Sequence, residues 1–70
     1  MKMDEEIFNM SLRKFLKKVG ITAQREIENT IRGAQAAGSM TGGGKVAAKA
    51  VITLEGFDDQ IVITSDIEIV

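Results

Sequence analysis

The sequence predicts an α+β fold, two helices followed by an antiparallel β-hairpin, and three observations support this class. In the first half, apolar residues recur every three or four positions, as on one face of a helix. From Val46 onward the apolar period changes to two, as on a strand. Between them, GSMTGGGK has no periodicity and indicates a connection. No internal repeat is visible, so we expect residues 1–70 to form a single domain.

The first helix is expected over about residues 4–19. Asp4 is placed to cap its N-terminus, and Glu5 and Glu6 follow where acidic side chains favour the helix dipole. Gly20 is placed to end the helix in the left-handed conformation, and Thr22 offers a hydroxyl to begin the next one. The apolar positions that define one face are Phe8, Leu12, Phe15, Leu16 and Val19.

The second helix is expected over about residues 23–37, with a thinner apolar stripe. Glu28 and Arg32 form an i,i+4 pair on its surface. Gly38 is placed to end it, and residues 38–45 are expected to be a flexible, glycine-rich connection. The stripe consists of Ala23, Ile27, Ile31 and Ala34.

The β-hairpin is expected over about residues 46–70, with EGFDD as the turn. Alternate residues of its first strand, from Val46 to Leu54, are apolar and share one face. The same alternation in the second strand marks four isoleucines: Ile61, Ile63, Ile67 and Ile69.

These four isoleucines are the candidate dimer sheet. A two-stranded hairpin alone is marginally stable in water. The chain has 70 residues, no cysteine and no histidine, so neither a disulfide nor a thiolate or imidazole zinc site can stabilise it. We therefore expect a homodimer in which a second copy completes a four-stranded sheet. The copies are expected to lie side by side or to exchange hairpins through the glycine-rich connection.

The glycine-rich connection resembles a phosphate-binding loop only superficially. That motif needs four residues between its glycines and a hydroxyl residue after the lysine. Here five residues separate Gly38 from Gly44, and Val46 follows Lys45. The loop also leads from a helix to a strand, which is the reverse of the required order. We expect no nucleotide and no other cofactor.

The segment SLRKFLKKVGITAQREIENTIR has the outline of a DNA-binding helix-turn-helix. Its proposed reading helix carries Glu26 and Glu28 beside Arg25 and Arg32, and phosphates would repel the acidic pair. The net charge of −1 gives no general attraction to nucleic acid. A nucleic-acid-binding regulator using the helix pair is thus the alternative function, not the leading one.

The basic run RKFLKK offers the candidate interaction surface: Arg13, Lys14, Lys17 and Lys18. Like charges at i,i+4 spacing destabilise a helix slightly, whereas cations near a helix C-terminus stabilise it by a similar amount. A solvated basic face therefore needs no ligand to exist. The other interpretation is that this face meets an acidic surface, of the chain itself or of a partner.

Catalysis is not expected. The chain lacks histidine, cysteine, tyrosine and tryptophan, and its remaining polar residues show no recognisable catalytic spacing. Asp58 and Asp59 fit a turn better than a metal site, so no metal is expected. No apolar run reaches the roughly 20 residues of a membrane span, and the N-terminus carries acids where a signal peptide would carry bases. We expect a cytoplasmic location and no membrane association.

The stretch FNMSLRKFLKKVGITAQREIENTIRGA, with the glycine-rich break and the two strands after it, resembles a family of short, functionally uncharacterised bacterial proteins. The resemblance implies a free-standing bacterial protein, more narrowly a proteobacterial one, and implies no activity or site. With the residue patterns it predicts a small, non-enzymatic, homodimeric interaction or accessory module with an unknown protein partner.

Overall fold

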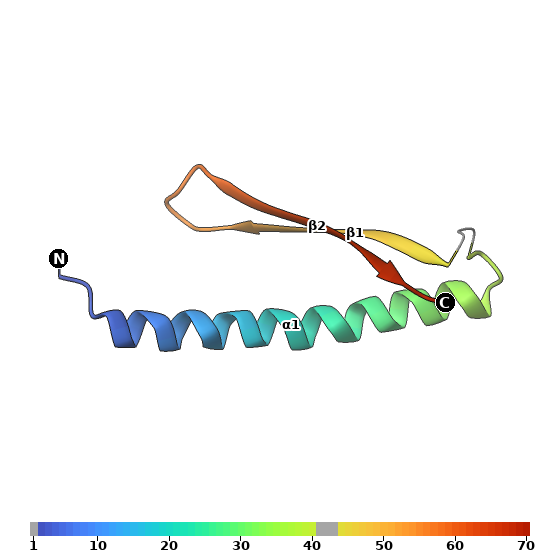
Figure 1. The fold of residues 1–70 in the computed structure, drawn as a ribbon, viewed down its shortest axis with the longest axis horizontal. Coiled ribbons are helices and arrows are strands. Elements are labelled where there is room, and N and C mark those ends of the chain that lie inside the picture. The colour runs from blue at the N-terminus through green and yellow to red at the C-terminus, as the bar shows by residue number, and fades with distance from the viewer. Residues whose placement is uncertain (1, 41–43) are drawn as a thin grey trace. The chain divides into compact units, whose positions relative to one another are not determined.

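The computed structural model describes residues 2–40 and 44–70. It contains one helix, α1 (Glu5–Ala36), and one antiparallel hairpin of β1 (Lys45–Thr53) and β2 (Gln60–Glu68), as Figure 1 shows. The predicted α+β class is thereby confirmed. The chain divides into two compact units, Met1–Met40 and Thr41–Val70, and each is described by itself.

The N-terminus of α1 is capped as predicted. Asp4 has an extended backbone, and its Oδ1 accepts hydrogen bonds from the backbone N–H of Glu6 at 3.0 Å and of Ile7 at 3.1 Å. These bonds satisfy two of the N–H groups that the first turn leaves without an intrahelical partner. The acidic Glu5 and Glu6 lie in the same turn.

The predicted break at Gly20 is wrong: the two helices expected over residues 4–19 and 23–37 are one continuous helix (Figure 1). Among the described glycines, positive φ occurs at Gly38, Gly44 and Gly56, so Gly20 does not adopt the left-handed conformation. A glycine inside a helix costs only about 1 kcal/mol relative to alanine, and no proline follows to stop the helix. The helix therefore continues through Thr22, which caps nothing.

The C-terminus of α1 ends at the predicted glycine in a Schellman motif. Gly38 has φ 69°, and its N–H donates to the carbonyl of Gln35 at 3.1 Å. The N–H of Ser39 donates to the carbonyl of Ala34 at 2.9 Å. Glycine fits this left-handed position because it has no Cβ to clash.

Of the connection predicted over residues 38–45, residues 41–43 lie outside the described residues. Lys45 belongs to β1. Gly44 has φ 92°, and its carbonyl oxygen accepts from the N–H of Ile69 at 2.7 Å and of Val70 at 3.2 Å. Backbone pairing therefore extends beyond the open end of the two strands.

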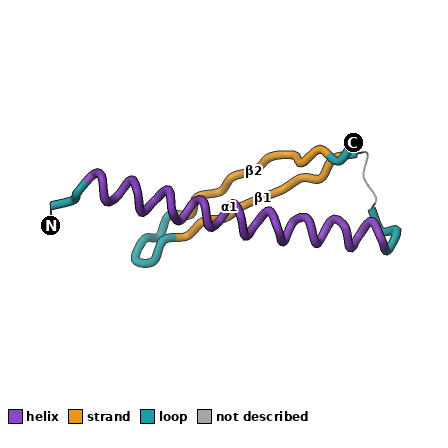
Figure 2. The backbone as a smooth tube through the Cα atoms, turned by 90° about the horizontal axis from the view of Figure 1, so that it is seen from below, coloured by secondary structure: helices purple, strands orange, loops and turns teal. Residues whose placement is uncertain are grey.

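The hairpin confirms the predicted strands and turn. Its register is uniform over nine residue pairs, from Lys45 opposite Glu68 to Thr53 opposite Gln60, and Figure 2 shows the two strands side by side. At the closed end, the N–H of Phe57 donates to the carbonyl of Leu54 at 3.1 Å. Gly56 has φ 89° at the third position of this turn, which a residue with a side chain would adopt only with strain.

No side chain is buried among the residues that the structure describes. Phe8 remains 45% exposed on α1, and Ile63 remains 54% exposed on β2. A single helix and a two-stranded hairpin each have one apolar side that they cannot cover by themselves. The apolar residues are thus available for contacts beyond their own unit. Within the described residues, no helix combines the length and the apolar composition needed to cross a membrane.

Candidate interaction surfaces

The apolar stripe of α1 runs through the expected break. Seven steps of three or four residues lead from Phe8 to Ala34, a mean spacing of about 3.7 residues, close to the 3.6 residues of one turn. The stripe therefore stays on one side of the helix and drifts around it by only about 80°. Its members are Phe8, Leu12, Phe15, Val19, Ala23, Ile27, Ile31 and Ala34.

The basic surface lies roughly opposite the beginning of this stripe. At about 100° per residue, its four side chains occupy a sector of about 140°. All four are exposed. Within the described part of the chain none of the four forms an ion pair, since the pairs there join Arg32 to Glu28 at 3.6 Å and Lys45 to Asp66 at 3.9 Å. The members of the basic surface are Arg13, Lys14, Lys17 and Lys18.

Apolar side chains that the sequence analysis did not predict as part of a surface lie inside this basic sector. Ile7 and Met10 are 66% and 72% exposed, and Ile21 is 52% exposed further along the same side. With Lys14 and Lys17 they form a second periodic row, in which successive members are three or four residues apart. This spacing was the signal available in the sequence.

Ile7 and Met10 lie with three of the four basic side chains along one open hollow of about 500 Å³. The hollow is formed by α1 alone, and its lining mixes apolar atoms with cationic groups. The surface thus offers cationic groups and apolar contact area side by side. The residues that line the hollow are Ile7, Met10, Ser11, Arg13, Lys14 and Lys17.

The hairpin has one apolar face, as the alternation predicted. Directly opposite residues of an antiparallel pair share a face, so the register places Val46 beside Ile67 and Ile52 beside Ile61. Ala50 beside Ile63 and Ala48 beside Ser65 complete this face. The other face carries Lys45, Lys49, Thr64, Asp66 and Glu68, together with the pair of Val51 and Val62.

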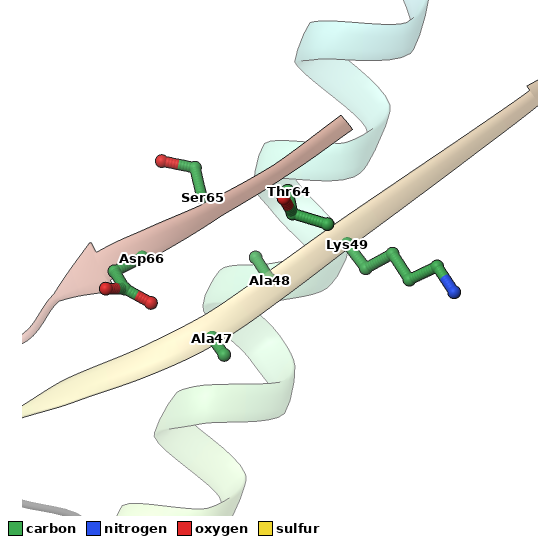
Figure 3. A pocket seen from close by; sticks show the side chains of 6 residues that line it. All are labelled: Ala47, Ala48, Lys49, Thr64, Ser65 and Asp66. Carbon is green, nitrogen blue, oxygen red and sulfur yellow. The ribbon is translucent and has the colours of Figure 1, made fainter. Parts of the chain in front are cut away.

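An open hollow of about 370 Å³ lies at the middle of the hairpin, where several side chains are small (Figure 3). Figure 3 shows the Lys49 side chain extending away from Asp66, and Ser65 pointing to another side of the strand than Asp66. A catalytic or metal-binding set would converge on one point, whereas the polar groups of this hollow do not. Its lining residues are Ala47, Ala48, Lys49, Thr64, Ser65 and Asp66.

The structure places the candidate residues on separate units. The basic surface belongs to α1, whereas Ile61, Ile63 and Ile67 lie on β2 and Ile69 follows it. Among the described residues, no three acidic side chains gather in a group that could hold a metal ion.

In a comparison with known proteins, a family of unknown function, DUF6494, matches the chain over residues 3–70. The matched range contains both the basic surface and the hairpin. No curated protein and no solved structure matches the chain. The resemblance to a functionally uncharacterised family is confirmed, while the bacterial origin stays a prediction. Because the match extends over almost the whole sequence, the chain belongs to the family of unknown function DUF6494.

Proposed function

We propose that this protein is a small, non-enzymatic interaction module that works as a homodimer and binds a protein partner through the basic surface of α1. The observation that supports the proposal most directly is the combination of four exposed cations with the exposed apolar side chains of Ile7 and Met10. Together these side chains combine charge with apolar contact area on one side of the helix, a combination that suits a binding surface.

The chemistry of the surface favours an acidic, amphipathic segment as the partner. Carboxylates would pair with Lys14 and Lys17, and an apolar side chain would pack on Met10, whose flexible thioether adapts to different shapes. Opposite charge speeds association and makes it sensitive to salt, while the apolar contact slows dissociation.

The non-enzymatic character is supported by the residue types present. The chain has no histidine, cysteine or tyrosine to act as acid, base or nucleophile. The two hollows described above are open and shallow, unlike the pockets that enclose substrates. We propose that the module acts in the cytoplasm.

Nucleic-acid binding through a helix pair is not proposed. A helix-turn-helix needs two helices that cross at a turn. Residues Glu5–Ala36 form one helix, so this geometry is absent from that segment.

A binding titration tests the proposal with a synthetic helical peptide that carries glutamate and leucine at alternating turns. The double variant Lys14→Glu/Lys17→Glu is compared with Lys45→Glu/Lys49→Glu, which changes the net charge of the chain by the same amount on the hairpin. We expect the first variant to weaken binding at least tenfold and the second to retain it. An equal effect of both variants would reduce the basic surface to a solvated face.

A further inference from the structure

We propose that the second copy binds along the outer edge of β2, antiparallel to it, with the twofold axis of the dimer at Ser65. This inference rests on the homodimer proposed above and specifies its edge and its register.

The hydrogen-bond direction of β2 identifies the edge. The N–H of Ile69 donates to the carbonyl of Gly44 at 2.7 Å, so Ile69 directs its backbone polar groups toward β1. The direction of the backbone N–H and C=O groups alternates from one residue of a strand to the next, so those of Ile67 and Ser65 also point toward β1. The residues between them face the other way, and in the described two-stranded sheet that edge has no neighbouring strand. The outward-facing residues are Val62, Thr64, Asp66 and Glu68.

Such an edge is a template for another strand, and its side chains decide which strand fits. Directly opposite residues of an antiparallel pair lie on the same side of the sheet, and the isoleucines of β2 all have odd numbers. Two copies therefore place their apolar faces on the same side only when odd-numbered residues lie opposite odd-numbered residues. The numbers of two opposite residues must then have an even sum. An odd sum would bring Ile63 of one copy to the same side as the polar face of the other. The twofold axis must therefore pass through a residue and not between two residues.

The isoleucines of this segment, three in β2 and Ile69 directly after it, are placed symmetrically about Ser65. Two isoleucines precede this residue at alternate positions, and two follow it. With the axis at Ser65, Ile63 lies opposite the partner's Ile67, and Ile61 lies opposite the partner's Ile69. The twofold axis repeats each pair on its other side, so all four isoleucines of each copy gain a cross-strand apolar neighbour. Thr64 then lies opposite the partner's Asp66, so no like charges meet.

Neighbouring axes give poorer pairs. An axis at Thr64 places Ile63 opposite the partner's Ser65 and Val62 opposite the partner's Asp66. An axis at Asp66 places two carboxylates opposite each other, which is destabilising.

The outer edge of β1 is also less suitable for self-pairing. Three of its nine residues are alanines, which are depleted in strands, and two are lysines, which oppose pairing at an edge. Its best axis, at Ala50, would set alanines against isoleucines where β2 sets isoleucines against isoleucines. The side chains therefore favour β2.

Cysteine cross-linking tests the register, because the natural chain has no cysteine. At the proposed axis, Ser65 and the partner's Ser65 form a non-hydrogen-bonded pair with Cα atoms about 4.5 Å apart. This distance lies within the range of disulfides, about 4.4–6.8 Å. For Thr64 and the partner's Thr64 the same register gives about 8 Å, which is too far. Variants Ser65→Cys, Thr64→Cys and Ala50→Cys are oxidised mildly at micromolar concentration and compared on non-reducing gels.

We expect Ser65→Cys to form a covalent dimer at least tenfold faster than the other two variants. Faster cross-linking of Thr64→Cys would move the axis, and faster cross-linking of Ala50→Cys would move the interface to β1; either result overturns the inference. Sedimentation of the wild-type chain separates the two proposals. A dimer without selective Ser65 cross-linking rejects this register alone, whereas a monomer of 7.6 kDa rejects the homodimer as well.

Discussion

The backbone N–H of Ile69 donates to the carbonyl oxygen of Gly44 at 2.7 Å, closing the open end of the hairpin. Gly44 has φ 92°, and a Cβ built there would lie 3.0 Å from Cγ2 of Val70. Gly44→Ala should therefore destabilise this end of the hairpin by about 1–2 kcal/mol, because of left-handed backbone strain and this close contact. Amide exchange at Ile69 measures the effect. A variant that exchanges at the wild-type rate would show that this end of the hairpin is open in solution.

Gly20 and Gly38 should respond in opposite directions to alanine. Gly20 lies inside α1, and apart from its chain neighbours and the nearby helix backbone nothing lies within 4 Å of a built Cβ. Gly20→Ala should therefore stabilise the helix by about 0.5–1 kcal/mol. Gly38 has φ 69°, so Gly38→Ala should destabilise it by about 1–2 kcal/mol. Circular dichroism during thermal unfolding, at one fixed protein concentration, compares the two variants. Destabilisation by Gly20→Ala would contradict the continuous helix and support the helix break that the sequence predicted at Gly20.

The N-cap of α1 gives a third prediction. Asp4→Ala removes the acceptor of the N–H groups of Glu6 and Ile7, and should cost about 0.5–2 kcal/mol. Asp4→Asn keeps an acceptor oxygen and should retain most of the stability, although it loses the favourable charge at the helix N-terminus. Helix content from circular dichroism measures both variants. Equal losses would indicate that charge, and not the hydrogen bonds, accounts for the effect of Asp4.

A proline on the outer edge of β2 should separate dimer formation from hairpin formation. The N–H of Thr64 faces away from β1, so Thr64→Pro removes no bond of the hairpin but blocks a strand added at that edge. We expect dimerisation at least tenfold weaker by sedimentation, with the strand signals of the hairpin kept in NMR spectra.

The matched control is Ile63→Pro, which removes an N–H that faces β1 and should disrupt the hairpin itself. If Thr64→Pro dimerises like the wild-type chain, the second copy does not use this edge.

Local signals in the sequence were sufficient for much of the fold. The Asp4 cap, the helix end at Gly38 and the two-residue period of the strands were all predicted, because each depends on a few neighbouring residues. Gly20 misled the prediction because glycine before Ile21 and Thr22 imitates the end of one helix and the start of another. The deciding feature was the apolar stripe that continues from Val19 across this glycine.

The candidate surfaces were only partly predictable. The four cations of the basic surface were identified from the sequence, but Ile7 and Met10 were not. The predicted apolar face was the stripe that begins at Phe8, and Ile7 and Met10 lie on the other side of the helix. The symmetric placement of four isoleucines about Ser65 is present in the sequence. Its meaning depends on the direction of the backbone hydrogen bonds, which only the register of the hairpin supplies.

Sedimentation equilibrium of the wild-type chain over a concentration series tests the central claim most directly. Since neither unit buries an apolar side chain among its described residues, we predict a mass twice the 7.6 kDa of the chain at micromolar concentration. A folded species of 7.6 kDa that persists as the concentration rises would contradict it.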